Sequence, residues 1–361
     1  MTSFRVIRAA VLTLAFATAW LAASAARSAG PVVGWGSNFR GQTTLPASVG
    51  GTTGKATAIS AGGAHSCAIQ AVTGNVVCWG YNSGGQAIPP AAVDGTSGTA
   101  SAIAAGGTHS CAIQASTGNV VCWGDNLYGQ TTPLPSVSGT AGTALAIAAG
   151  AYHSCAIESS IGAVVCWGSN SDGQATPPPS VNGTAGTADA ISAGHIHGCA
   201  IEVITGNVVC WGDNSGGQAT PPPSVNGTSG TATAIAAGGY HSCAIQAGTG
   251  HVVCWGNNSG GQATPPPSVD GTAGTATAIA AGYSHSCAVQ EGTAKVVCWG
   301  YNDEGQTTPP ASVDGTAGTA TAISAGGLHT LAIAAPEPAT ALLSAASLGS
   351  LLALARRRRL R

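Results

Sequence analysis

The chain has 361 residues and a formal net charge of −2, and only 7% of its residues are charged. Most of the basic residues lie near the two ends, so residues 30–335 carry three basic residues against twelve acidic ones, a net charge of −9. A body this acidic repels phosphate groups, which argues against nucleic acid as a partner.

Residues 1–29 have the parts of an export signal. Arg5 and Arg8 form a positive start, residues 9–23 are apolar, and small residues around Ala25 provide a cleavage site. A buried first helix is the alternative interpretation, but the run of small residues favours the signal. We therefore expect an exported protein whose signal peptide spans 1–29.

Residues 30–335 repeat one unit every 44 residues, and both a tryptophan and a histidine recur without slippage. Such a period indicates one supersecondary unit that buries its apolar face on its neighbours. The tryptophans are Trp35, Trp79, Trp123, Trp167, Trp211, Trp255 and Trp299. The histidines are His65, His109, His153, His197, His241, His285 and His329.

One unit contains three short predicted strands and no amphipathic helix. Residues 76–80 are β-branched and aromatic, residues 102–106 are small and apolar, and residues 109–114 form the third strand. Residues 81–86 are rich in turn formers, and residues 89–99 form a loop with proline and glycine. Short strands and evenly spaced turns favour an all-β propeller or a β-solenoid.

Cysteines follow the same period and suggest how the units are linked. Pairing across each hairpin, as in Cys67 with Cys78, uses every cysteine, and the one incomplete hairpin has Gly34 and Leu331 at both equivalent positions. The other regular pairing, Cys78 with Cys111, would leave the first and last cysteines unpaired. The favoured pairs are Cys67–Cys78, Cys111–Cys122, Cys155–Cys166, Cys199–Cys210, Cys243–Cys254 and Cys287–Cys298.

Half-hairpins at the two ends of the body predict that the repeats close into a ring. Residues 31–36 and 328–333 complete each other, whereas an open solenoid would need atypical end repeats. We therefore expect a seven-bladed β-propeller closed by strands from both termini. Each hairpin disulfide stabilises by roughly 2–3 kcal/mol and requires an oxidising compartment. Zinc sites need more closely spaced cysteine pairs, so no metal is expected.

The C-terminal segment, residues 336–361, has three parts in order. Pro336-Glu337-Pro338 precedes an uncharged stretch at 339–355, and five arginines follow. The order resembles the PEP-CTERM sorting tail of exported bacterial proteins. The resemblance implies a hydrophobic helix, recognition by an exosortase-type enzyme, and release or attachment at the cell surface. A plain membrane anchor is the alternative, since the stretch is just long enough to span a bilayer.

The repeat text resembles the repeat of the regulator of chromosome condensation (RCC1) family. Ala-Ile-Ala-Ala-Gly, His-Ser-Cys-Ala-Ile, Val-Val-Cys-Trp-Gly-x-Asn and Gly-Gln recur in order across residues 31–335. The resemblance implies a seven-bladed propeller with a strand exchanged between the termini. The short unit with cysteines is closer to secreted bacterial members, among them an inhibitor of β-lactamase. The nucleotide exchange of the best-known member acts on an intracellular partner, and fold does not imply function.

No residue pattern predicts catalysis or a cofactor. The periodic histidines occupy one place in every unit, which spaces them around a ring, and we expect them to hydrogen-bond between strands or blades. His195 and His251 break the period. Acidic turns such as 171–173 and 302–305 do not match a calcium-binding loop. No nucleophile has a matched base, and we expect a protein that is not an enzyme.

The copies differ most just before the periodic histidine and in the turn after Trp-Gly, and all six tyrosines fall there. Loop tyrosines offer large rigid area with a polar tip, which suits an interface. Resemblance to the inhibitor-type propellers assigns Tyr152, Tyr240 and Tyr283 to the binding face. The candidate binding rim is Tyr81, Tyr128, Tyr152, His195, Tyr240, Tyr283 and Tyr301.

These observations favour an exported, non-enzymatic propeller that binds a protein or a glycan through one rim, at the cell surface or in extracellular matrix. An inhibitor of a secreted enzyme is the alternative, and a guanine-nucleotide exchange factor is the weaker one. Membrane contact through the C-terminal segment is expected before processing.

Overall fold

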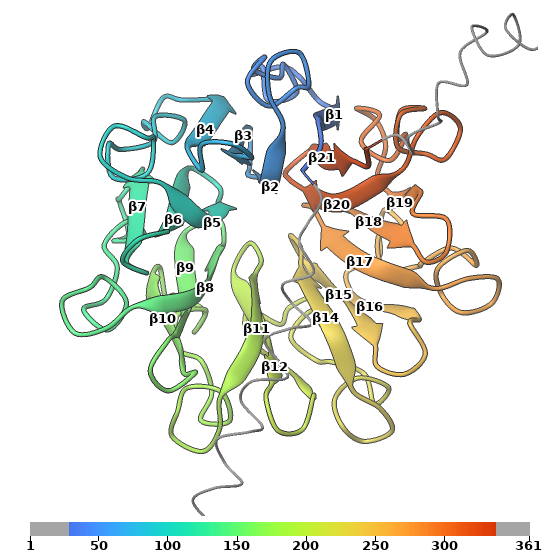
Figure 1. Ribbon diagram of the computed structural model, residues 1–361. Helices are drawn as coiled ribbons and strands as arrows, with labels where there is room; N and C mark the ends of the chain where they lie inside the picture. Colours follow the sequence, from blue (N-terminus) through green and yellow to red (C-terminus); the bar gives the residue numbers. More distant parts are fainter. Residues whose placement is uncertain (1–28, 337–361) are drawn as a thin grey trace, which may run out of the picture.

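The computed structural model describes residues 29–336, which form seven three-stranded antiparallel sheets arranged as blades around a central channel (Figure 1). These residues contain strands and turns but no helix. The predicted all-β propeller is therefore confirmed in its architecture. Most of the predicted signal and the tail from Glu337 onward lie outside the described residues, and both stay predictions. Within residues 29–336 no helix is long and apolar enough to cross a membrane.

Each blade contributes one innermost, one middle and one outer strand. The innermost strands are β2 (Ala56–Ala61), β5 (Ala100–Ala105), β8 (Ala144–Ala149), β11 (Ala188–Ala193), β14 (Ala232–Ala237), β17 (Ala276–Ala281) and β20 (Ala320–Ala325). The middle strands are β3 (His65–Gln70), β6 (His109–Gln114), β9 (His153–Glu158), β12 (His197–Glu202), β15 (His241–Gln246), β18 (His285–Gln290) and β21 (His329–Ala334). The outer strands are β4 (Val76–Gly80), β7 (Val120–Gly124), β10 (Val164–Gly168), β13 (Val208–Gly212), β16 (Val252–Gly256), β19 (Val296–Gly300) and β1 (Val32–Gly36).

The seventh blade joins the two ends of the body, because β1 pairs with β21 beside β20 (Figure 1). Its register places Gly34 opposite Leu331, where each other blade has a pair of cysteines. All six predicted hairpin disulfides are formed, with Cα–Cα distances of 4.0–4.1 Å. Closure therefore depends on hydrogen bonds and packing at one blade and on an added covalent link at the others.

The apolar core lies between blades. A representative cluster joins Ile69 and Val76 of the first blade to Ala112 and Trp123 of the second. Val93, from the proline-rich loop, completes this cluster and is fully buried. The loop thus anchors one blade to the next, a role that its irregular sequence did not predict.

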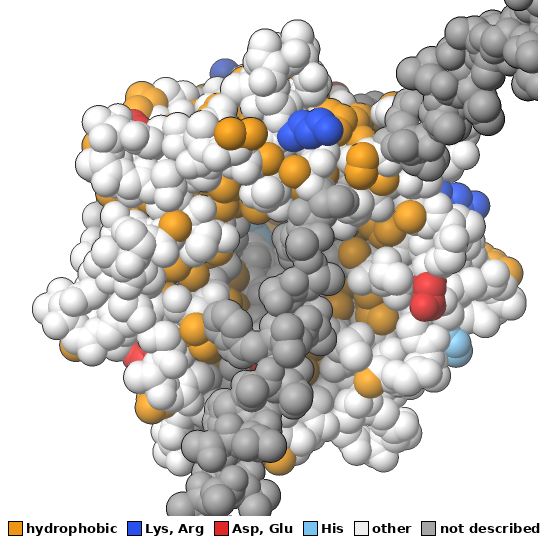
Figure 2. Space-filling view, viewed as in Figure 1, with side chains coloured by type: hydrophobic (Ala, Val, Ile, Leu, Met, Phe, Trp, Pro, Cys, Tyr) orange, Lys and Arg blue, Asp and Glu red, His pale blue; other side chains and the backbone are white. Residues whose placement is uncertain are grey.

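The outer surface carries little charge. Figure 2 shows few Lys, Arg, Asp or Glu side chains on the face it draws, and most of that face is neither charged nor apolar. Solubility therefore rests on uncharged polar groups, as the composition indicates.

Candidate binding site

Two loops of every blade open onto the same face of the propeller. One connects the innermost and middle strands and the other follows the outer strand. In the first blade, His65 at the start of β3 pairs with Gly80 at the end of β4, so the loops are adjacent. The backbone N–H of Tyr81 donates to the carbonyl oxygen of Ala64 at 2.9 Å. We call the face formed by these loops the mouth face, and all six tyrosines belong to it.

A closed ring of backbone hydrogen bonds surrounds the channel on the mouth face. In each blade an amide of the inner loop donates to a carbonyl of the next blade, and the last blade donates to the first. The bonds are Gly63→Gly106, Gly107→Gly150, Ala151→Gly194, His195→Gly238, Gly239→Gly282, Tyr283→Gly326 and Gly327→Gly62, at 3.0–3.2 Å. We call these seven donor residues the mouth ring.

The ring requires glycine at its acceptor positions. A Cβ on Gly62 would lie 2.6 Å from the carbonyl oxygen of Gly106, closer than real contacts allow, and the other acceptor glycines are similarly crowded. Apart from His195 and Tyr283, alanines and glycines line the channel at this face, with a volume of about 120 Å³. Small residues therefore let seven blades approach the axis closely.

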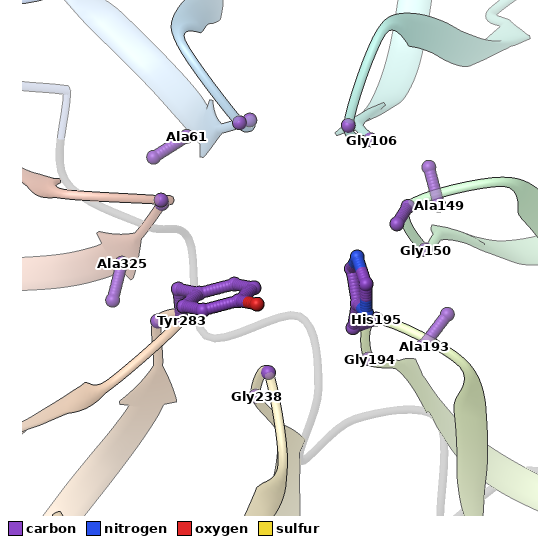
Figure 3. A pocket seen from close by; sticks show the side chains of 18 of the residues that line it. Ala61, Gly106, Ala149, Gly150, Ala193, Gly194, His195, Gly238, Tyr283 and Ala325 are labelled. Carbon is purple, nitrogen blue, oxygen red and sulfur yellow. The ribbon is translucent and has the colours of Figure 1, made fainter. Parts of the chain in front are cut away.

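Two large side chains break the sevenfold symmetry of the mouth ring. His195 and Tyr283 occupy two of the seven positions of the mouth ring, and the other five positions hold Ala151 and four glycines. Both side chains project into the channel (Figure 3). Their ring centroids are 5.5 Å apart in an edge-to-face arrangement. This half of the mouth is filled, while the half lined by glycines is open.

Five aromatic rings form a continuous cluster across this part of the face. Tyr128 packs edge-on against Tyr152 at 5.5 Å, and Tyr152 packs against His195 at 5.7 Å. His195 also contacts Tyr240 at 5.5 Å, and Tyr240 contacts Tyr283 at 5.6 Å. We call these five residues the aromatic cluster. Side chains that are far apart in sequence thus make one apolar surface with polar tips.

Beside the aromatic cluster lies a cavity of about 590 Å³. Its side-chain walls include Tyr152, His195, Tyr283, Tyr301 and Leu328, and glycines of the open half complete the lining. The volume falls within the range of small-ligand sites, about 300–1,000 Å³. Four of the seven predicted rim residues line this cavity, namely Tyr152, His195, Tyr283 and Tyr301.

Carboxylates adjoin the cavity wall at several points. Thr108, which lines the cavity, donates its hydroxyl hydrogen bond to Asp125 Oδ2 at 3.3 Å. The Tyr301 hydroxyl donates to Asp303 Oδ2 at 2.6 Å. The loops that follow the outer strands hold the acids Asp125, Asp172, Asp213, Asp303 and Glu304, and one basic residue, Arg40. The mouth face is therefore negative as well as aromatic.

In the aromatic cluster, the pKa shifts of His195 and Tyr283 favour the neutral form of each side chain. Burial lowers the pKa of His195, and the nearby Asp213 carboxylate opposes part of this shift. Burial raises the pKa of Asp213, but hydrogen bonds from Ser215 and Gln218 outweigh it and hold that pKa below its usual value. The hydrogen bond from Tyr283 to the Tyr240 hydroxyl, with burial, raises the pKa of Tyr283 to about 12.

Two rim candidates lie apart from the aromatic cluster. Tyr81 packs under the Arg40 guanidinium, 4.8 Å from its ring centroid, and Phe39 lies on the same cation at 5.2 Å. Tyr301 lines the cavity but contacts none of the five rings of the cluster. His251, which also breaks the histidine period, lies just before β16 at the opposite end of its blade.

The seven periodic histidines are completely buried, and six of them join neighbouring blades through hydrogen bonds. In the closing pair of blades, Ser66 Oγ donates to the carbonyl of Gln42 at 2.9 Å and accepts from His329 Nε2 at 2.9 Å. Five equivalent bonds, at 2.8–2.9 Å, follow around the ring. The predicted bridging role is thus confirmed for six histidines. His153 departs from it, because Gly198 stands where its serine partner would be and neither of its ring nitrogens has a partner.

Each carbonyl that accepts from a serine also accepts from a tryptophan. Trp79 Nε1 donates to the Gln42 carbonyl at 2.8 Å, and the same bond recurs at every Trp-Gly. Tryptophan, histidine and a hydroxyl residue therefore form one repeated network at six of the seven blade interfaces, with Thr330 in place of serine at one of them. The glutamine recurs with the same 44-residue period as the tryptophan and the histidine. The sequence did not show that its backbone carbonyl lies at the centre of the network.

The histidine–serine pairs have the separation of a nucleophile and its base, but their setting does not suit catalysis. His65 and Ser110 are 0% exposed, and the hydroxyl hydrogen of Ser110 is donated to the Gln86 carbonyl. A substrate cannot reach such a pair. In residues 29–336, no group of three or more His, Cys, Asp or Glu side chains is placed to hold a metal ion.

Comparison with known proteins identifies the repeat. The family model of the regulator of chromosome condensation (RCC1) repeat matches residues 56–86, 100–130, 145–174, 232–262 and 276–306. No curated protein matches the chain significantly.

Several solved structures are similar to this one. The ectodomain of the receptor kinase CR4 from Physcomitrella patens is 26% identical, with 74% of this chain and 67% of that chain covered and a TM-score of 0.57. The CRINKLY ectodomain of the receptor kinase ACR4 from Arabidopsis thaliana is 25% identical over 74% and 88%, with a TM-score of 0.59. Prp20p from Saccharomyces cerevisiae, 18% identical over 86% and 92% with a TM-score of 0.67, shares the fold.

Proposed function

Because the chain carries RCC1 repeats closed into a ring, we propose that it is an exported, non-enzymatic binding module that captures a protein or glycan through the mouth face. The observation that carries this proposal is the aromatic cluster beside the cavity. Its members lie at the two places where the repeats differ most, and they converge on one surface. Clustered tyrosines with polar tips are typical of binding surfaces.

Two observations support a location outside the cytoplasm. Six disulfides persist only in an oxidising compartment. The two plant receptor kinases carry a similar propeller in their ectodomains. Attachment at the surface through the PEP-CTERM-like tail, with an exosortase-type enzyme as its processing partner, forms part of the same proposal.

The absence of an enzymatic role is likewise proposed from the symmetry of the interior. The candidate acid–base groups repeat from blade to blade and are buried, whereas an active site needs one accessible constellation. The symmetry is broken at the mouth, where the aromatic cluster consists of tyrosines and of a histidine whose neutral form is favoured by burial. These groups suit contact with a partner better than proton transfer.

Capture of a partner by the oxidised full chain tests the proposal. The chain is used as bait on envelope and extracellular fractions of its source cells, and recovered proteins and polysaccharides are identified. The double variant Tyr152→Ala with Tyr240→Ala should lose the partner, because it removes two central rings of the aromatic cluster. The Tyr81→Ala variant is the matched control, since Tyr81 lies on the same face outside the cluster.

If the double variant recovered as much partner as the native chain does, the aromatic cluster would be removed as the binding surface and the proposal would fail. Recovery of one enzyme in a stoichiometric complex, inhibited by the native chain, would instead support the inhibitor alternative. Envelope proteins or polysaccharide would support a surface or matrix role.

A further inference from the structure

We propose that the cavity on the mouth face receives a basic side chain, an arginine or a lysine, presented by a protein partner. This inference rests on the proposed function and names the chemistry of the partner. It follows from three features that meet at the cavity: aromatic walls, adjoining carboxylates and a backbone whose hydrogen bonds are already made.

The walls suit a cation on an aliphatic stem. Faces and edges of Tyr152, Tyr283 and Tyr301 border the cavity, and tyrosine rings attract a guanidinium or ammonium placed over them. This protein uses the same chemistry on itself, because Arg40 lies over Tyr81 at 4.8 Å from its ring centroid. The cavity of about 590 Å³ is large enough for such a side chain and its neighbours.

The surrounding charge has the matching sign. Two lining residues, Thr108 and Tyr301, each donate a hydrogen bond to a carboxylate, and Asp213 lies close enough to His195 to affect its pKa. The single basic residue of the mouth-face loops, Arg40, packs on Phe39 and Tyr81 outside the cavity lining. The cavity wall itself holds no charged side chain, and an entering cation therefore finds carboxylates just behind the wall and no competing positive charge.

The lining is mostly apolar, and its polar side chains are a few hydroxyls, among them those of Thr108 and Ser284, and the imidazole of His195. The amides of Gly63, Gly107 and Gly327 are consumed by the mouth ring, and these residues have no side chain. A sugar needs several convergent donors and acceptors, whereas a basic side chain needs aromatic faces and nearby negative charge. The lining therefore favours the cation.

The test uses the full oxidised chain and two capped peptides, acetyl-Gly-Arg-Gly-amide and its citrulline counterpart, which is neutral and nearly the same shape. Binding is followed by tyrosine fluorescence and by titration calorimetry at low and high salt. We expect the arginine peptide to bind at least about tenfold more tightly than the citrulline peptide, which corresponds to about 1.4 kcal/mol. Added salt should reduce that preference.

Two variants locate the site. Tyr283→Gly restores the residue found at four equivalent positions of the mouth ring, so the fold tolerates it, and it should weaken the arginine peptide about tenfold. Asp303→Asn keeps the shape of the wall and should lower the preference for arginine over citrulline. Tyr81→Ala is the control and should bind as the native chain does.

Equal affinity for the two peptides, no binding of either up to about 10 mM, or no effect of Tyr283→Gly would overturn the inference. Tighter binding of methyl glucoside than of the arginine peptide would also overturn it, in favour of a glycan. If capture depends on the mouth face but the peptides are not distinguished, only the preference for a cation falls. If capture does not depend on that face, the proposed function fails, whatever the peptides do.

Discussion

The blade interfaces and the mouth face use the same repeats in opposite ways. At the interfaces, histidine, serine, tryptophan and a glutamine carbonyl recur with nearly constant geometry, so that seven equivalent contacts share the work of holding the ring. On the mouth face, the seven positions of the mouth ring hold glycine, alanine, histidine or tyrosine. Repetition therefore supplies stability, and departure from repetition supplies a unique surface.

The interior repetition has two exceptions. The closing blade has no disulfide, because Gly34 faces Leu331. The third interface lacks the two hydrogen bonds of the serine hydroxyl, one with His153 and one with the Gln174 carbonyl, because Gly198 replaces serine there. Both exceptions give matched comparisons within a single molecule.

Acid should have the largest effect on the interfaces. Burial lowers the pKa of the seven periodic histidines from 6.5 to about 3 or 4. Below pH 6.5 the unfolded chain therefore binds protons that the folded chain refuses, and the free energy of unfolding falls as the pH falls toward 4. Each histidine contributes up to about 1.4 kcal/mol per pH unit. Urea unfolding between pH 7.5 and 4.5 measures the slope.

The four carboxyl groups whose pKa is lowered by hydrogen bonds lose their stabilising contribution mainly below about pH 4, outside that window. They are Asp94, Asp213, Asp270 and Asp314. His195→Gly and His251→Gln serve as controls outside the buried set and should leave the steep slope in place. A free energy of unfolding that stays constant from pH 6.5 to 4.5 would contradict the burial of the seven imidazoles in the neutral form.

A seventh disulfide should have the next largest effect. Gly34→Cys with Leu331→Cys places cysteines at the register that the other six pairs occupy, and it links the two ends of the ring. Since a Cβ on Gly34 would lie 3.2 Å from Leu331 Cδ2, the second substitution also clears the space. We expect about 2–4 kcal/mol from the link, reduced by the lost packing of Leu331, which is fully buried.

The measurement for this variant is the unfolding rate and hydrogen exchange of β1, with the reduced form of the same variant as reference. Oxidation should slow the opening of β1 in particular. If β1 exchanges no faster than the other outer strands in the native chain, the closing blade is not the weakest one.

The smallest effect separates two histidines of equal burial. His109→Ala and His153→Ala each leave the same cavity, but only His109 donates a hydrogen bond, to Ser154 at 2.8 Å. Both variants should be destabilised, and His109→Ala by about 1 kcal/mol more, the net worth of one hydrogen bond. Chemical denaturation at pH 7.5 gives the difference. A larger loss for His153→Ala would show that its ring has a partner in solution.

The sequence by itself determined the fold and the covalent frame. Fixed spacing of tryptophan, histidine and cysteine defines one strand unit, and the paired absence of cysteine at Gly34 and Leu331 leads to closure through β1. These features are readable because each depends on neighbours within one unit or on a count around the ring. The signal peptide and the sorting tail lie outside the repeat and, for the most part, outside residues 29–336, so both stay predictions.

Only the tertiary structure decided the site. Tyr128, Tyr152, His195, Tyr240 and Tyr283 come from different blades, and no local pattern indicates that their rings touch. Nor does the sequence show that the Tyr81 ring packs against the Arg40 guanidinium, or that Val93 anchors a loop between blades. The physical reason is that strand periodicity is set by bonds along the chain, whereas contacts across the channel depend on how closely glycine lets seven separate loops approach one axis.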